Sequence, residues 1–278
     1  MSSPVFLMLL AAFGASALGG VLGMASGIFI VPALTLFFGV DMHDAVGISL
    51  VSVIACSCAT AAPFIKREWT NVRLAVVLET ATTTGALCGV LLTGWLPVRL
   101  LQLLFVGVLG ISARQMMVKR NDPVPEAASD RLTLATRLRL HDVYAEAGTD
   151  RPVAYRVGNV PVALVLMYVA GVLSALLGIG SGVLKIPAMD MALRMPIKAS
   201  SATSNFMIGV TAATGACAYI ARGDLNVTLA APIALGSVLG ALVGAKLLSA
   251  LPADKLRLGF VGVLVAMMAM MAISAIRG

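Results

Sequence analysis

Charged residues are scarce in this chain. They make up 12% of its 278 residues, whereas hydrophobic residues make up 59%, and the mean hydropathy is +0.98. A soluble fold could not cover its surface with so few polar side chains. Apolar runs such as 72–92, 160–177 and 225–248 are each long enough to span about 30 Å of hydrocarbon, or nearly so. We therefore expect one all-α, polytopic membrane protein, because continuous runs of this length are helices.

Histidine and cysteine are also few, which excludes two kinds of site. The two histidines, His43 and His141, are too far apart in sequence to suggest a metal cluster, so we expect neither a metal nor a cofactor. All four cysteines lie in apolar stretches, where small-residue packing is a better interpretation than a disulfide framework. They are Cys56, Cys58, Cys88 and Cys217.

Three further absences narrow the function. No run of Lys and Arg is interleaved with aromatic residues, so the net charge of +7 does not predict nucleic-acid binding. Glu79 has no His and no second clustered carboxylate beside it in the apolar stretches, so we expect no enzyme. The first residues lack a basic stretch, so we expect 5–18 to be retained rather than cleaved as a signal peptide.

The sequence does contain an internal repeat with a spacing of 155 residues. Gly23-Met-Ala-Ser-Gly27, followed by Pro32, returns as Gly178-Ile-Gly-Ser-Gly182, followed by Pro187. A duplicated membrane unit is typical of secondary transporters. The other matched positions are Asn71 and Asn226, Gly85 and Gly240, Gly89 and Gly244, Pro97 and Pro252, and Phe105 and Phe260.

Each repeat is predicted to begin with a broken or re-entrant helix and to continue with three transmembrane helices. We assign 1–119 to the first repeat, 120–156 to a polar cytoplasmic linker and 157–278 to the second repeat. The predicted helices are 5–22 with 27–38, 44–65, 72–94 and 98–119, then 160–177 with 182–193, 198–221, 226–249 and 254–276. Within the linker, 129–140 is interpreted either as a short helix on the bilayer surface, with Leu132, Leu138 and Leu140 toward the lipid, or as a plain solvated segment.

The charge pattern favours an inverted arrangement of the two repeats. If each broken segment turns back on itself, most cations near helix ends fall on the linker side, as the positive-inside rule requires. If each broken segment crosses the membrane once, the repeats are parallel and several cations face outside. We therefore expect inverted repeats with both termini outside.

The two glycine-rich breaks are the candidate binding site. Glycine permits non-helical backbone, and such backbone at membrane depth lies buried in protein or lines a cavity. A helix that begins there presents unpaired N–H groups to a small anion. The alternative is that these glycines only allow close helix packing. The site residues predicted at the breaks are Gly23, Ala25, Ser26, Gly27, Gly180, Ser181 and Gly182.

Polar residues in the neighbouring spans are further candidates. Ser49, Ser52, Thr203, Ser204 and Asn205 either donate to the same anion or bond between helices. Lys185, three residues past the second break, is predicted to contact the anion directly. Glu79 is predicted to carry a coupling proton; the alternative is that it pairs with Lys185 or packs against neighbouring threonines.

These elements resemble the TauE/SafE family of sulfite exporters. The resemblance rests on the doubled Gly-x-x-Ser-Gly-x4-Pro elements, Gly23–Pro32 and Gly178–Pro187, and on the Asn-Val and Leu-Pro pairs between helices. It covers essentially the whole chain outside the linker. It implies a multi-pass transporter of the bacterial cytoplasmic membrane that moves sulfite, sulfoacetate or a similar organosulfonate, often outward.

We accordingly expect a secondary transporter that works by alternating access, with export as the first hypothesis. The alternative is proton- or cation-coupled uptake of another small anion. The expected partners are the anion, the lipid bilayer and a coupling proton or cation. The sequence is compatible with either a monomer or a homo-oligomer. A channel would need a ring of like polar groups, and a scaffold protein would have no reason to keep two matched helix breaks.

Overall fold

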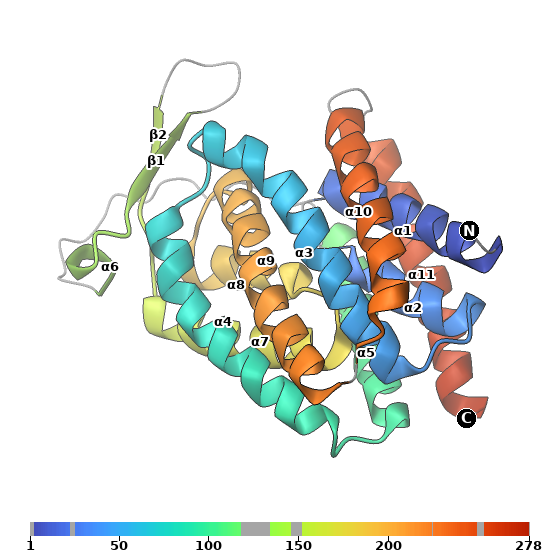
Figure 1. Ribbon diagram of the computed structural model, residues 1–278. Helices are drawn as coiled ribbons and strands as arrows, with labels where there is room; N and C mark the ends of the chain where they lie inside the picture. Colours follow the sequence, from blue (N-terminus) through green and yellow to red (C-terminus); the bar gives the residue numbers. More distant parts are fainter. Residues whose placement is uncertain are drawn as a thin grey trace.

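The protein is a bundle of long apolar helices, seen here in a computed structural model (Figure 1). The structure describes residues 3–22, 26–117, 134–145, 152–223, 225–248 and 253–277. Among them, five helices are long and apolar enough to cross a membrane. The expected all-α polytopic architecture is confirmed. These five spans are Met42–Lys66, Val72–Thr93, Val160–Leu177, Ala199–Arg222 and Val227–Gly244.

The helices follow the predicted order in both repeats. The first repeat contains α1 (Ser3–Leu22), α2 (Gly27–Phe37), α3 (Met42–Lys66), α4 (Val72–Thr93) and α5 (Val98–Met117). The second contains α7 (Val160–Leu177), α8 (Gly182–Leu193), α9 (Ile197–Arg222), α10 (Val227–Leu248) and α11 (Ala253–Arg277). Between them lie α6 (Leu134–Arg137), β1 (Asp142–Ala145) and β2 (Pro152–Tyr155).

The repeated asparagines are helix caps. The Asn71 side chain accepts a hydrogen bond from the backbone N–H of Leu74 at the start of α4, at 2.9 Å. Its counterpart Asn226 accepts one from Leu229 at the start of α10, at 3.4 Å. Each cap satisfies an N–H that the first turn of a helix leaves unpaired, so each fixes where its helix begins.

The repeated glycines join the two halves of the chain. A methyl group at Gly85 or Gly89 of α4 would lie 2.2 or 2.5 Å from a carbonyl oxygen of α7, that of Tyr168 or Val172. At Gly240 and Gly244 of α10 the nearest atoms are the carbonyl oxygens of Phe13 and Ala17 in α1, at 2.1 and 2.2 Å. Small residues let helix backbones approach this closely in a membrane. Each repeat therefore packs its third long helix against the first helix of the other repeat.

The two central helices α3 and α9 run in opposite directions (Figure 1). The Ser57 hydroxyl, late in α3, donates to the carbonyl of Asn205, early in α9. Leu50, earlier in α3, contacts Gly215, later in α9. Because α3 and α9 occupy the same place in their repeats, an antiparallel course is what an inverted arrangement requires.

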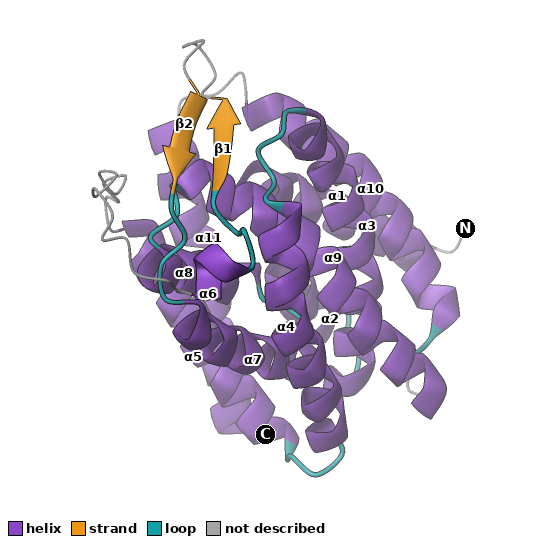
Figure 2. Cartoon of the chain, turned by 90° about the vertical axis from the view of Figure 1, so that its left-hand side faces the viewer, coloured by secondary structure: helices purple, strands orange, loops and turns teal. Residues whose placement is uncertain are grey.

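The linker contains more structure than the sequence suggested. β1 and β2 form an antiparallel hairpin that projects from one end of the bundle (Figure 2). Leu140, expected at the lipid surface, is instead 1% exposed, and its carbonyl accepts a hydrogen bond from the Asn71 side chain at 2.8 Å. The lipid-surface alternative is therefore wrong for Leu140, because its side chain is buried in an apolar cluster with Leu74, Tyr155 and Val157. Leu138 is exposed, whereas Ser129 and Leu132 lie outside the described residues.

Candidate functional site

The second helix break is a tight turn between α7 and α8. Gly178, Gly180 and Ser181 all have positive φ angles, of 67°, 72° and 57°. Glycine adopts such angles without strain, whereas serine rarely does. The helix thus ends at Leu177 and a new one begins at Gly182.

After this break the chain turns back on itself. The backbone N–H of Gly158 donates to the carbonyl of Leu193 at 3.0 Å, and that of Asn159 donates to Ala192 at 2.9 Å. The beginning of α7 and the end of α8 are therefore neighbours. In the second repeat the broken segment is a helical hairpin with its turn inside the bundle.

The first break lies between α1 and α2. Gly23 and Ala25, two of the predicted site residues, fall outside the described residues, so their part in the site stays a prediction. Ser26 and Gly27 are described and fully buried, and α2 begins at Gly27. The Ser26 carbonyl accepts the N–H groups of Phe29 and Ile30 at 3.0 and 3.1 Å.

The two breaks meet each other. A methyl group at Gly27 would lie 2.2 Å from the carbonyl oxygen of Gly178 and 2.8 Å from the hydroxyl of Ser49. The Ser49 hydroxyl itself donates to the Gly178 carbonyl at 2.7 Å. Glycine at position 27 therefore permits direct contact between the start of α2 and the end of α7, which belong to different repeats.

Three buried serines line the side of the first break. The hydroxyl of Ser26 lies 3.2 Å from that of Ser52, which in turn is hydrogen-bonded to that of Ser237. All three side chains are 0% exposed. The sequence analysis missed Ser237 of α10; a polar residue in a span next to Gly236 was the available signal.

Other buried hydroxyl and amide groups have no hydrogen-bond partner among the described residues. The Ser181 and Ser204 hydroxyls and the Asn205 side-chain nitrogen make no hydrogen bond with any described residue. Ser181 stands at the N-cap position of α8, but its side chain makes no capping hydrogen bond with a described residue. An unpaired buried polar group is destabilising, so these donors are available to a polar ligand.

Thr203 takes a different role from the one expected. Its hydroxyl accepts the backbone N–H of Asn71 at 3.2 Å, where α4 begins. It thereby joins α9 to α4 at the linker end of the bundle. This contact follows the alternative of bonding between helices.

Lys185 and Glu79 form a buried ion pair beside the second break. Their Nζ and Oε2 atoms are 3.4 Å apart, and Lys185 is 0% exposed. Lys185 also donates to the Thr211 hydroxyl at 2.5 Å, and that hydroxyl donates to Glu79. Pairing with Lys185 was one of the two alternatives for Glu79. Thr211, a polar residue in a span, was missed.

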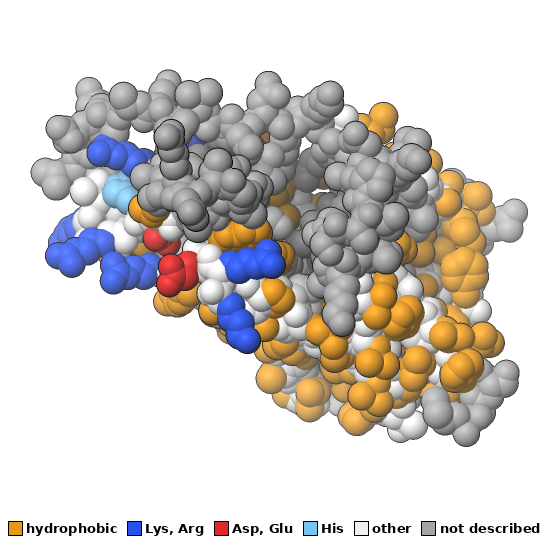
Figure 3. All heavy atoms as spheres, turned by 90° about the horizontal axis from the view of Figure 1, so that it is seen from above, with side chains coloured by type: hydrophobic (Ala, Val, Ile, Leu, Met, Phe, Trp, Pro, Cys, Tyr) orange, Lys and Arg blue, Asp and Glu red, His pale blue; other side chains and the backbone are white. Residues whose placement is uncertain are grey.

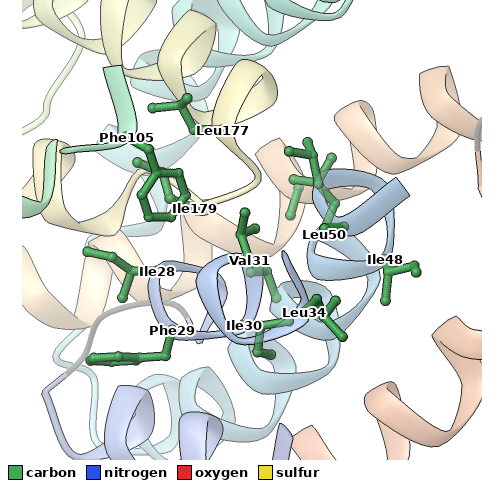
Figure 4. Packing of buried hydrophobic residues seen from close by; sticks show 14 of the residues in the cluster. Ile28, Phe29, Ile30, Val31, Leu34, Ile48, Leu50, Phe105, Leu177 and Ile179 are labelled. Atoms are coloured by element: carbon green, nitrogen blue, oxygen red, sulfur yellow. The ribbon is translucent and has the colours of Figure 1, made fainter. Parts of the chain in front are cut away.

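Apolar side chains surround the region where the breaks meet. Figure 4 shows Ile28, Val31, Leu177 and Ile179 from the two broken segments close to Phe105 of α5. All five residues are buried, with 0% of their surface exposed. The two breaks thus meet among buried apolar side chains, and electrostatic interactions are stronger in such surroundings than in water.

This arrangement can bind a small anion. The first N–H groups of α8 have no intrahelical acceptor, and the positive end of the helix dipole lies with them. The unpartnered Ser181 hydroxyl is at the same helix end, and the Lys185 ammonium belongs to the next turn. Among the described residues no group of three or more His, Cys, Asp or Glu could hold a metal ion.

Comparisons with known proteins identify a family and two relatives. A model of the family described as "Sulfite exporter TauE/SafE" matches residues 8–271. The chain is 26% identical to the probable membrane transporter protein YdhB of Bacillus subtilis (strain 168) over 246 residues, covering 88% of this chain and 91% of the relative. It is 25% identical to the probable membrane transporter protein YunE of the same organism, covering 84% of each. No solved structure matches it.

Proposed function

Because the chain belongs to the TauE/SafE family of sulfite exporters and is thus a multi-pass membrane transporter, we propose that it moves a small sulfur-containing oxyanion. The substrate is sulfite, sulfoacetate or a similar organosulfonate. It binds between the two helix breaks and is released to one side of the cytoplasmic membrane after being taken up from the other. The contact of Gly27 with Gly178 is the observation that carries this proposal, because it places both breaks at one locus.

The proposed contacts follow from the donors present. Backbone N–H groups at the start of α8 bind the oxyanion, together with the hydroxyls of Ser181 and Ser26 and the ammonium of Lys185. Ser52, Ser204 and Asn205 complete the polar surroundings. Hydrogen bonds from such donors to a charged oxygen are stronger than those between neutral groups.

The distribution of charge supports an inverted topology with the linker in the cytoplasm. Figure 3 shows Lys and Arg side chains gathered on the side that carries the hairpin, while apolar side chains cover much of the remaining described surface. At the other end of α3 and α9 the described charges nearly balance. Cation-rich ends face the cytoplasm. Among the described residues, the exposed cations of the linker end are Lys66, Arg67, Arg73, Arg114, Arg137, Arg139, Arg156 and Arg194.

Export fits the membrane potential. Each negative charge that leaves a cell with an inside-negative potential gains about 2.3 kcal/mol per 100 mV. A divalent oxyanion therefore leaves downhill. Uptake of the same anion requires a co-transported cation or proton.

The test is the flux of radiolabelled sulfite or sulfoacetate in proteoliposomes. We expect Ser181→Ala to lower flux about tenfold, since it removes a donor from the site without changing its packing. Ser112→Ala is the matched control, because the buried Ser112 hydroxyl is satisfied by Val108 of its own helix at 2.6 Å. Unchanged flux in both Ser181→Ala and Gly182→Leu, in well-inserted protein, would show that the site is elsewhere.

A further inference from the structure

The ion pair of Glu79 and Lys185 does not belong to the repeat. The residues at the equivalent positions are Ala234 and Ile30, both apolar. The two charges come from different halves of the chain, Glu79 from α4 and Lys185 from α8, and Thr211 of α9 bridges them. The ion pair therefore joins the two repeats without being part of their common pattern, and it lies beside the second break only.

Its position ties the pair to the binding site. The backbone N–H of Lys185 donates to the carbonyl of Ser181 at 2.8 Å, so Lys185 stands one turn into α8. Side chains on a helix point toward its N-terminus. The Lys185 side chain therefore leaves α8 within one turn of the break at which we place the anion.

Burial makes the two charges dependent on each other. Lys185 is fully buried and Glu79 is 8% exposed, and a charge at such a place is costly without a partner. An anion at the break attracts Lys185 but is repelled by the Glu79 carboxylate. A proton on Glu79 removes that repulsion and leaves Lys185 to the anion.

We propose that Lys185 exchanges Glu79 for the bound anion while Glu79 takes up one proton, so that a proton accompanies each transported anion. This inference rests on the proposed function and identifies its coupling ion. The proton comes from water on the side where the anion enters and binds a carboxylate oxygen of Glu79. It leaves on the other side with the anion, after which the ion pair forms again.

No other ionisable group described nearby competes for this role. Tyr168 of α7 packs its backbone against Gly85, six residues beyond Glu79. The remaining described titratable groups on α4, α8 and α9 lie five or more residues along their helices from Glu79, Lys185 or Thr211. They are Arg73, Cys88, Asp190, Arg194, Cys217, Tyr219 and Arg222.

The experiment measures protons and anions together in proteoliposomes that contain a trapped pH-sensitive dye. Radiolabelled sulfoacetate is one substrate, because its acid groups stay ionised between pH 6 and 8; sulfite is the other. The unaltered protein is expected to move about one proton per anion. Glu79→Gln is expected to lower the number of protons moved per transported anion at least tenfold.

Two further variants complete the test. Thr84→Ala is the matched control, because this exposed threonine of α4 bonds only to carbonyls of its own helix among the described contacts, and it should keep the proton ratio. The double variant Glu79→Gln with Lys185→Gln removes both charges, so it guards against misfolding from one unpaired charge. It should lose both proton movement and most anion binding.

The outcomes separate the two proposals. Anion flux without proton movement by the unaltered protein, or an unchanged ratio in Glu79→Gln, overturns the coupling role and leaves the transport function in place. Absence of flux for both anions overturns the proposed function, and the coupling role with it.

Discussion

At the scale of single residues, close contact between backbones determines which substitutions a position tolerates. Gly27 faces the carbonyl of Gly178 at a distance that no side chain can occupy. We expect Gly27→Ala to push the two breaks apart, which should lower the free energy of unfolding by about 1–3 kcal/mol, as is typical of an overpacked position. Transport should fall at least tenfold. Flux per correctly inserted molecule checks this.

Gly107→Ala is the control for that substitution. A methyl group at Gly107 of α5 meets no atom within 4 Å, so stability and flux should match the unaltered protein. Equal losses in the two variants would mean that the contact between the breaks is unimportant.

A second residue-scale prediction concerns Asn71. Its side chain caps α4 and donates to the Leu140 carbonyl and to the Tyr155 hydroxyl, at 2.8 and 3.2 Å. Asn71→Ala should remove about 1 kcal/mol of capping and also release the linker. Hydrogen exchange at Leu74 and in the hairpin should become at least about fivefold faster.

Asn226→Ala provides the comparison for Asn71. Asn226 is exposed and, among the described contacts, caps only α10. Its loss should accelerate exchange at Leu229 and leave the hairpin protected. If both variants left the hairpin unchanged, Asn71 would not hold the linker to the bundle.

At the scale of elements, the hairpin carries a pH-dependent contact. The Nδ1 atom of His141 accepts the backbone N–H of Val157 at 3.1 Å, which requires a neutral ring. Burial, and then the nearby charge of Arg156, lower the pKa of His141 below its ordinary value of 6.5. A lowered pKa in the folded state means that this stability is present above pH 6.5 and is lost as the pH falls further.

The measurement is hydrogen exchange in the hairpin between pH 7.5 and 5, corrected for the intrinsic rate. Protection at Val157 should fall toward pH 5 in the unaltered protein. In His141→Gln this dependence on pH should vanish. Protection that rises toward low pH would contradict the assignment.

The elements themselves were largely predictable from the sequence, and their contacts were not. Apolar runs and the doubled glycine motifs predicted the helix bounds, and Gly178 and Gly180 predicted the second break. Contacts such as Ser52 with Ser237 join residues far apart in the chain, and no local pattern specifies them. The hairpin was missed because its strands are four residues long, too short for a clear alternation.

At the scale of the whole molecule, the prediction concerns sidedness. In a protein whose native cysteines are replaced, Glu68→Cys and Arg156→Cys should resist a membrane-impermeant thiol reagent in intact cells. Asp41→Cys should react, because it lies at the opposite end of α3. After permeabilisation all three exposed positions should react. The reverse pattern would invert the orientation.

The repeat symmetry was visible in sequence as spacing and takes on physical meaning in the fold. Gly85 contacts Tyr168, and Gly240 contacts Phe13. Gly240 lies 155 residues after Gly85, and Tyr168 lies 155 residues after Phe13, so the two contacts are equivalent in the repeat. The sequence could reveal equal spacing, but which helix each glycine faces depends on how the halves assemble. The ion pair of Glu79 and Lys185 departs from the symmetry, so the repeat could not predict it.

The packing of α1 against α10, a helix of the other repeat, also affects the order in which contacts form during synthesis. Phe13 leaves the ribosome early, whereas Gly240, against which it packs, follows 227 residues later, a delay of about 11–45 s at ordinary rates of synthesis. During that time α1 waits in the lipid without its principal neighbour. The final packing of α1 therefore has to wait until α10 has been made.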